Sequence, residues 1–236
     1  MEEAKVEARK KDGISIYLCD TRIHCLEVRG AMSDFEVPEP PDDFRVPYPV
    51  GYETKAFTRD GFPITIRPIK PEDAPLLVEA FKQLSKRSIF FRFLDAVKEL
   101  PPKWIKRFTR IDYARDVAMV AVQEIESRER ILGVCRIMRD PQERETTQGE
   151  FAIVVEDAWQ GKGIGNLLAK HSISIARKLG IRSIWGIVSP ENNKMLVMAK
   201  NLGFSVELDA EALVYEIRME LSSDDHKENT REICEE

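Results

Sequence analysis

No stretch of the sequence approaches the roughly 20 consecutive apolar residues that a membrane-spanning helix needs. The first residues, MEEAKVEARKKDG, are charged and lack the apolar core of a secretory signal. The four cysteines lie far apart along 236 residues, so they do not form the framework of a disulfide-rich protein. We therefore expect a cytoplasmic protein with reduced thiols that does not associate with a membrane.

The chain also has little net charge. Its formal charge is -5, and the acidic end, residues 222–236, supplies most of it. The remaining body is close to neutral, which gives no electrostatic argument for binding nucleic acid. We expect residues 222–236 to form a solvated, disordered tail.

The rest of the chain divides into two zones. Residues 1–50 form an N-terminal extension. Its short apolar pieces, 14–18 and 23–28, are expected to pair as a small hairpin or an added strand pair. A proline-rich linker follows, since five prolines lie between positions 38 and 49. Residues 51–221 carry a regular pattern of strands and helices that suits one globular domain.

Within residues 51–221 the hydrophobic periodicity predicts alternating elements. The expected strands are 63–67, 116–125, 131–138, 150–155, 184–188 and 214–220, and the expected helices are 71–84, 85–93, 101–110, 164–179 and 191–202. Gly180 and Gly203 stand where the last two helices should end. This order predicts a mixed α/β or α+β sheet domain without repeats.

The sharpest signal is the turn Gln160-Gly-Lys-Gly-Ile-Gly165. It follows the apolar strand Phe151-Ala-Ile-Val-Val155 and opens the helix from Ile164. Glycines let backbone N–H groups approach a ligand closely, and the helix N-terminus adds unpaired donors and a positive dipole end. We therefore expect this turn to bind a phosphate or pyrophosphate, with Lys162 adding a positive charge.

Other glycine-rich turns fit this segment less well. A Walker A loop needs Ser or Thr after its lysine, and Gly163 stands there. The dinucleotide-binding fingerprint needs a third glycine three places after the second, and Asn166 stands there. A tight strand-to-helix turn without a ligand is the structural alternative.

The turn matches the Q/R-x-x-G-x-G/A signature of the GNAT superfamily of acetyltransferases. More narrowly, the region from about Phe57 to Leu221 resembles the GNAT domain of the Pat-type protein lysine acetyltransferases. The matching pieces are Thr58-Arg-Asp-Gly61, Ile66-Arg-Pro-Ile69, Pro71-Glu-Asp73, Arg92-Phe93, Phe108-Thr109, Ile111-Asp-Tyr113, Gly149-Glu-Phe-Ala152, Glu191-Asn192 and Leu202-Gly-Phe204. The resemblance does not cover residues 1–50.

The resemblance implies a central sheet that is splayed at its middle, with acetyl-CoA in the splay and an amine acceptor on the opposite side, where the segment Ser85–Phe93 is expected. No metal is expected. The implied cofactor-binding residues are the backbone groups of Ala152, Ile153 and Val154, the turn residues Gln160, Gly161, Lys162, Gly163, Ile164 and Gly165, and Asn192. Asn192 is also a reasonable helix N-cap, and it could serve both roles.

Glu150 matches the family's catalytic glutamate. A lysine amine with a pKa near 10.4 is mostly protonated at pH 7, with roughly one part in 10³ neutral. Attack on a thioester needs the neutral amine, and a carboxylate beside the acceptor can remove the proton directly or through water. A strand-end glutamate that faces water is the alternative interpretation of Glu150.

Several other residues are weaker candidates. Ala199 and Lys200 occupy the stretch where many relatives place a general-acid tyrosine, so the general acid is unassigned. Cys135 is expected to be a buried apolar residue rather than a nucleophile, and His171 a satisfied core histidine. Cys19, His24 and Cys25 do not have the spacing of a zinc site. The basic helix face Lys103, Lys106, Arg107 and Arg110 is expected to be a solvated surface, or to receive an acidic protein substrate.

The resemblance also suggests the acceptor. It implies a lysine on a folded protein, in particular the active-site lysine of an AMP-forming acyl-CoA synthetase. This protein would meet exposed basic groups at the mouth of an open groove, such as Lys86, Arg87 and Arg92. Two alternatives remain: a small-molecule amine as acceptor, or a catalytically inactive module that binds acyl-CoA and regulates a larger assembly.

Overall fold

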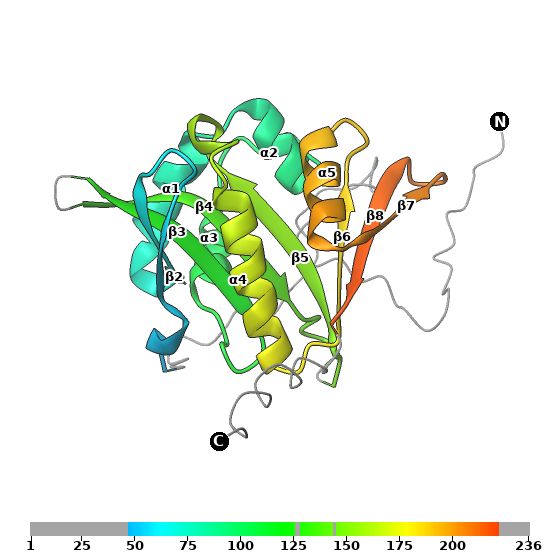
Figure 1. Ribbon diagram of the computed structural model, residues 1–236, viewed down its shortest axis with the longest axis horizontal. Coiled ribbons are helices and arrows are strands. Elements are labelled where there is room, and N and C mark those ends of the chain that lie inside the picture. Colours follow the sequence, from blue (N-terminus) through cyan, green and yellow to red (C-terminus); the bar gives the residue numbers. More distant parts are fainter. Residues whose placement is uncertain (1–46, 126–127, 144, 222–236) are drawn as a thin grey trace, which may run out of the picture.

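One eight-stranded sheet forms the centre of the protein in this computed structural model, which describes residues 47–125, 128–143 and 145–221 (Figure 1). The strand order is β1-β2-β3-β4-β5-β6-β8-β7, and among these described strands only the β5–β6 pair is parallel. The strands are β1 (Thr54–Phe57), β2 (Pro63–Pro68), β3 (Val117–Ile125), β4 (Arg128–Met138), β5 (Gln148–Val155), β6 (Ser183–Val188), β7 (Ser205–Asp209) and β8 (Val214–Glu220). The expected mixed sheet is confirmed.

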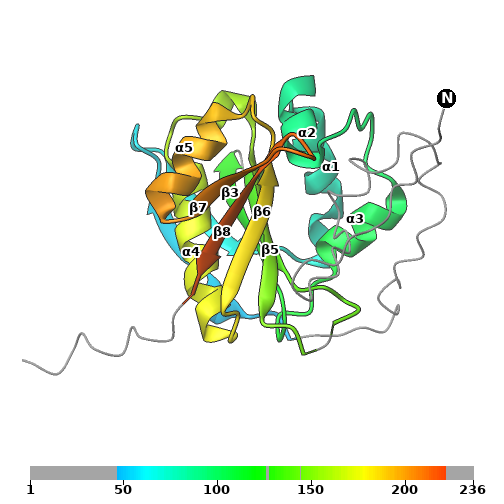
Figure 2. The same ribbon diagram turned by 90° about the vertical axis from the view of Figure 1, so that its right-hand side faces the viewer.

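Helices cover both faces of this sheet (Figure 2). They are α1 (Ala74–Lys82), α2 (Lys86–Phe93), α3 (Pro102–Thr109), α4 (Ile164–Lys178) and α5 (Asn193–Leu202), with short 3-10 turns at Val50–Tyr52, Pro71–Asp73 and Asp157–Trp159. Helices α4 and α5 lie on one face, and α1, α2 and α3 lie on the other. None of the helices in the described ranges combines the length and apolar composition that crossing a membrane requires.

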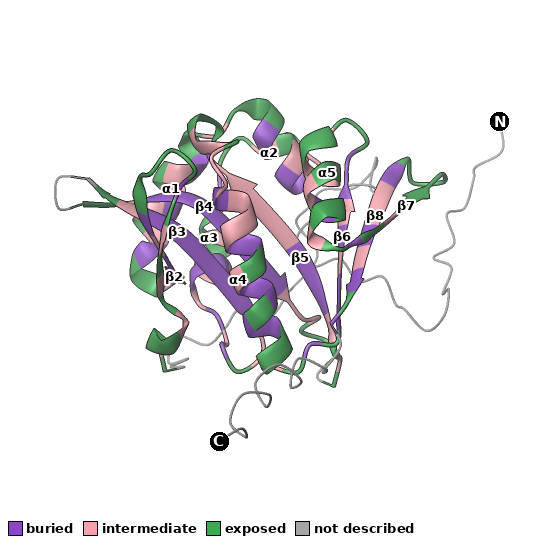
Figure 3. Ribbon diagram, viewed as in Figure 1, coloured by how far each residue is buried: buried purple, intermediate pink, exposed green. Residues whose placement is uncertain are grey.

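The core has two layers because the central strands are buried on both faces (Figure 3). Along β3, Val117 and Met119 pack in the layer under α4, whereas Ala118 and Val120 pack in the layer under α1, α2 and α3. A strand covered on both sides reads as a continuous apolar run rather than an alternating one. Strand β4 is also buried along most of its length, whereas β5 is only half-buried from Ala152 to Val155.

The helix ends follow local signals in the sequence. Ser85 caps α2 by accepting a hydrogen bond from the Ser88 backbone N–H at 3.1 Å. Gly180 and Gly203 have φ of +74° and +95° beyond α4 and α5, as expected for C-terminal glycines. The helix expected over 71–84 is instead a 3-10 turn followed by α1, because Pro71 and Pro75 both lie in its first turns.

The sheet opens between β5 and β6. Their parallel ladder has three pairs, and the last joins Glu150 to Trp185. Just beyond it, β6 passes so close to β5 that a Cβ on Gly186 would lie 2.7 Å from the Phe151 carbonyl oxygen. After this contact the two strands have no ladder pairs, so the inner edge of β5 from Phe151 onward is open to a ligand. The expected splay is confirmed.

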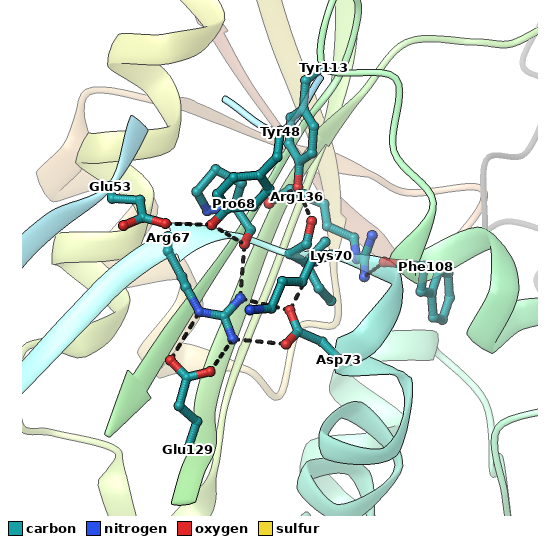
Figure 4. A network of polar contacts seen from close by, with 12 residues as sticks. Tyr48, Glu53, Arg67, Pro68, Lys70, Asp73, Phe108, Tyr113, Glu129 and Arg136 are labelled. Atoms are coloured by element: carbon teal, nitrogen blue, oxygen red, sulfur yellow. Dashed lines mark hydrogen bonds and ion pairs between the residues drawn. The ribbon is translucent and has the colours of Figure 1, made fainter. Parts of the chain in front are cut away.

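The N-terminal edge of the sheet contains a strand that the sequence did not predict. Strand β1 pairs with β2 through four residues and alternates between exposed and half-buried positions. Next to it, Tyr48 donates hydrogen bonds to Glu53 at 2.7 Å and to the Pro68 carbonyl at 3.3 Å (Figure 4). The domain therefore includes residues that precede the first expected strand.

A buried ion pair fixes β2 to the start of α1 (Figure 4). The Arg67 guanidinium donates to both carboxylate oxygens of Asp73 at 2.7 and 2.8 Å and also pairs with Glu129. Burial alone would lower the pKa of Arg67, but the hydrogen bonds to these carboxylates outweigh that effect, so the pKa lies above its usual value. This pair belongs to the scaffold, since neither Arg67 nor Asp73 lines the groove described below.

Candidate functional site

The turn predicted to bind phosphate lies between β5 and α4. Gly161 and Gly163 have φ of +78° and +91°, which only glycine adopts without strain. Gly163 is also the N-cap residue of α4. The first N–H groups of this helix therefore point out of its end, where they and the helix dipole favour an anion.

A groove of about 1030 Å³ opens at this turn. Its walls come from the end of β5, the turn and the start of α4, from α5 with its preceding loop, from α2, and from Arg59 in the loop between β1 and β2. The predicted site residues that line it are Ile153, Val154, Gln160, Gly161, Gly163, Gly165 and Asn192. Residues far apart in the sequence are thus brought to one continuous surface that leads from the turn along β5.

Four predicted site residues do not line this groove. Ile164 is fully buried in the core, so only its backbone can serve a ligand. Ala152 faces a smaller apolar cavity on the other side of β5. Lys162 and Glu150 also do not line the groove, and their contacts are described below.

Lys162 forms an ion pair with Asp60, which lies in the loop between β1 and β2. Its Nζ lies 2.7 Å from Asp60 Oδ2 and 4.7 Å from the centre of the Trp159 ring. The hydrogen bond from Lys162, with a second from Thr58, holds the pKa of Asp60 below its usual value. The expected free positive charge of Lys162 is therefore neutralised by a carboxylate from another segment.

Gln160 and Asp157 attach α2 to the turn. Asp157 accepts hydrogen bonds from the Ser85 backbone N–H at 2.9 Å and from the hydroxyls of Ser85 and Ser88 at 2.8 and 2.9 Å. Although burial raises the pKa of Asp157, these hydrogen bonds hold it below its usual value. Gln160 Nε2 donates to Ser88 Oγ and to the Val155 carbonyl. The helix on the expected acceptor side is therefore hydrogen-bonded to the segment expected to hold the cofactor.

Arg92 is a buried cation that the sequence analysis placed at an exposed mouth. Its side chain is only 8% exposed, and its guanidinium stacks 4.9 Å from the centre of the Phe93 ring. Arg92 lines both the groove and the apolar cavity under α1, α2 and α3. Its Nη1 is buried and has no hydrogen-bond partner among the described residues. A buried unmatched donor is costly, so this position favours a ligand oxygen.

Glu150 lies where β5 and β6 separate. Its side chain is 7% exposed, and its backbone is opposite Met138 on β4 and Trp185 on β6. The alternative of a glutamate that faces water does not hold. From Val155 at the turn to Glu150 the strand covers about 16 Å, a distance that an extended pantetheine arm can span.

The remaining candidates that the structure describes have contacts typical of structural residues. Asn192 caps α5, since its Oδ1 accepts a hydrogen bond from Met195 N at 3.2 Å. Cys135 is fully buried, and burial raises the pKa of its thiol to about 12, which does not suit a nucleophile. His171 is half-buried, and its Nε2 lies 2.7 Å from the Tyr52 carbonyl oxygen. Cys19, His24 and Cys25 lie outside the described residues.

Sequence reasoning did not select Arg59 or Trp159, which both line the groove. Trp159 is placed by the 3-10 turn directly before Gln160. Arg59 comes from the loop between β1 and β2, about 100 positions before the turn. The piece Thr58-Arg-Asp-Gly61 was part of the resemblance, but nothing in the sequence indicates that this loop contacts the turn.

This geometry agrees with the comparisons to known proteins. The Acetyltransferase (GNAT) domain family matches residues 64–205. The acetyltransferase PA5475 of Pseudomonas aeruginosa is 31% identical over 150 residues, which are 64% of this chain and 79% of that protein.

Solved structures agree as well. The GNAT domain of S. lividans PAT superposes with a TM-score of 0.68 at 30% identity, covering 74% of this chain and 99% of that one. A GNAT-family acetyltransferase from Streptococcus pneumoniae gives a TM-score of 0.55 at 25% identity, covering 67% and 99%. The chain belongs to the GNAT family of acetyltransferases, whose fold binds acetyl-CoA.

Proposed function

We propose that this protein transfers the acetyl group of acetyl-CoA to a lysine amine in a ternary complex, with Glu150 as the general base. The observation that carries this proposal is the arrangement of three features along β5. They are the glycine turn at its end, its open edge facing β6, and the buried Glu150 carboxylate where β5 and β6 separate. The turn offers N–H donors for the pyrophosphate, and the inner edge of β5 offers unpaired backbone groups for the pantetheine amides.

The chemistry follows from this arrangement. Glu150 takes a proton from the lysine ammonium, and the neutral nitrogen attacks the thioester carbonyl carbon. The C–S bond breaks, and the thiolate of CoA leaves. The second nitrogen proton, lost as the amide forms, reaches the thiolate through water. The fully buried Ala199 stands where many relatives have a tyrosine, so a water is the proposed carrier of this proton.

The proposed acceptor is a lysine of a folded protein, in particular an AMP-forming acyl-CoA synthetase in the cytoplasm. The support is the likeness to the GNAT domain of S. lividans PAT over 99% of that domain and the character of α2. Lys86 and Arg87 on α2 are exposed, and no acid occurs between Ser85 and Phe93. A site for a small ammonium compound would instead be expected to present carboxylates.

A competition assay tests this proposal. The full chain is given acetyl-CoA with an acyl-CoA synthetase and a panel of free amines and amino acids, and products are mapped by mass spectrometry. We expect acetylation of a single synthetase lysine with the highest catalytic efficiency. A free amine that is acetylated far more efficiently than any protein would replace the protein substrate, and binding of acetyl-CoA without any transfer would favour an inactive regulatory module.

A further inference from the structure

The loop between β1 and β2, residues 58–62, is fixed against the glycine turn. The Arg59 backbone N–H donates to the Lys162 carbonyl at 2.9 Å, and the carboxylate of Asp60 pairs with the Lys162 side chain. Next to this ion pair, the Phe62 ring meets the Trp159 ring edge-on, with 5.9 Å between centroids. Backbone, ionic and aromatic contacts therefore hold this loop in a defined position beside the turn.

The position of the loop directs the charges of two neighbouring cations, Lys162 and Arg59, to different places. Lys162 belongs to the turn, but its charge is directed to Asp60 and lies over the Trp159 and Phe62 rings. Arg59 belongs to the loop, yet its side chain lines the groove. Among the residues that the structure describes, no carboxylate forms an ion pair with the Arg59 guanidinium. Arg59 therefore offers its charge to the groove, whereas Lys162 does not.

The Arg59 side chain also lies directly over the start of α4. A Cβ built on Gly163 would come within 3.2 Å of Arg59 Cγ and 3.5 Å of Arg59 Nε. Gly163 is the residue whose following N–H groups form the end of the helix. A guanidinium this close to the helix end can bind the same anion as those N–H groups.

A second feature of the groove also indicates an oxygen-rich ligand. At the α2 wall, the buried Arg92 has an Nη1 without a partner among the described residues. The two acids on the groove wall are Asp157 and Glu191, and Asp157 is occupied by the N-terminus of α2. The cations on the groove wall are Arg59, Arg87, Arg92 and Lys194, and Lys194 donates a hydrogen bond to Gln160 Oε1. The groove therefore carries more cationic than acidic side chains.

We propose that Arg59 binds the pyrophosphate of the acyl-CoA and supplies the positive charge that the turn motif suggests for Lys162. This inference rests on the proposed use of acetyl-CoA. It gives the loop between β1 and β2 a direct part in cofactor binding. Lys162 then acts indirectly, by holding Asp60 and with it the loop that positions Arg59.

Calorimetry with the full chain tests this assignment. The titrants are CoA, 3′-dephospho-CoA and pantetheine, which differ in their phosphates. We expect Arg59→Ala to weaken binding of CoA and of 3′-dephospho-CoA by about tenfold or more, the effect of one hydrogen bond between charged groups. Binding of pantetheine should not change. Arg59→Lys should recover part of the loss, because it restores the charge without the fork of donors.

Lys55→Ala is the matched control, since it removes the same charge from an exposed position on β1 of the same hairpin. It should bind both CoA compounds as the parent does. Equal affinity of Arg59→Ala and the parent would overturn the inference and leave the proposed function standing. A loss confined to CoA would overturn the pyrophosphate assignment in favour of the 3′-phosphate. A parent chain that does not bind CoA would contradict the proposed function itself.

Discussion

Glu150 and Trp185 form the last pair of the parallel ladder between β5 and β6, so a buried carboxylate stands where the sheet opens. This placement results from the register between the two strands. The close approach of the two strands at this point requires Gly186, because the Cβ of any other residue would collide with the Phe151 carbonyl oxygen. The chemistry proposed for Glu150 depends on this junction.

The first prediction concerns Glu150 as the base. Glu150→Gln keeps the size of the side chain but cannot take a proton, so turnover should fall by about 10²–10⁴. Affinity for acetyl-CoA should stay close to that of the parent, because Glu150 does not line the groove. Single-turnover kinetics and calorimetry measure the two quantities separately. Unchanged turnover would remove Glu150 from the mechanism.

The second prediction concerns the glycine turn. Gly163→Val introduces a β-branched residue at a φ of +91° and against Arg59, so affinity for acetyl-CoA should weaken by about tenfold or more, which is about 1.4 kcal/mol. Gly180→Val is the matched control at the other end of α4, since it has a φ of +74° and no atom near its Cβ. The control should lose stability but retain affinity. Calorimetry on both variants distinguishes strain from loss of the site.

The sequence was sufficient where a signal is local. The position of the glycine turn between a strand and a helix, the helix ends at Gly180 and Gly203 and the burial of Cys135 were predicted, and the structure confirms them. Binding of a phosphate by the turn stays a prediction. The splay was expected only through the resemblance, because it depends on the register of β6 against β5. No periodicity of a single strand encodes that register.

Contacts between distant segments were not predictable. Asp60, which neutralises Lys162, lies 102 positions away. Arg92 was expected at the exposed mouth of an acceptor groove, but it is buried and shares an apolar cavity with residues of α1, α3 and β4. Strand β1 has only four residues, and Lys55 and Ala56 within it give a weak strand signal. In each case the deciding partner comes from another part of the chain.

A third prediction links Asp116 to the pH dependence of stability. Burial raises the pKa of Asp116 to about 6, while an unfolded aspartate titrates near 3.9. Between these values the folded state binds more protons than the unfolded state, so the Asp116 contribution to the free energy of unfolding falls as pH rises from about 4 to about 6.

Asp116→Asn removes this titration and keeps an oxygen that can accept the hydrogen bond of the Arg139 backbone N–H. Urea denaturation at several pH values should therefore show that, from about pH 4 to pH 6, the free energy of unfolding of the variant rises relative to that of the parent. Identical pH profiles would show that Asp116 titrates at its ordinary pKa in the folded protein. The difference between the profiles isolates Asp116 from the other carboxylates.

The last prediction is that residues 1–50 are not needed for the chemistry. No predicted site residue lies among them, and the groove is built entirely from residues after position 58. A chain that begins at Gly51 should fold and bind acetyl-CoA with the affinity of the parent. It should be slightly less stable, by about 1 kcal/mol, because it lacks the hydrogen bonds of Tyr48 to Glu53 and to the Pro68 carbonyl.

A chain that begins at Pro47 keeps Tyr48 and is the matched control, and it should recover that stability. Thermal denaturation and calorimetry on the two truncated chains measure stability and affinity. If the shorter chain does not fold while the longer one does, the segment around Tyr48 is an essential part of the domain rather than a linker. If neither folds, residues before Pro47 pack on the domain.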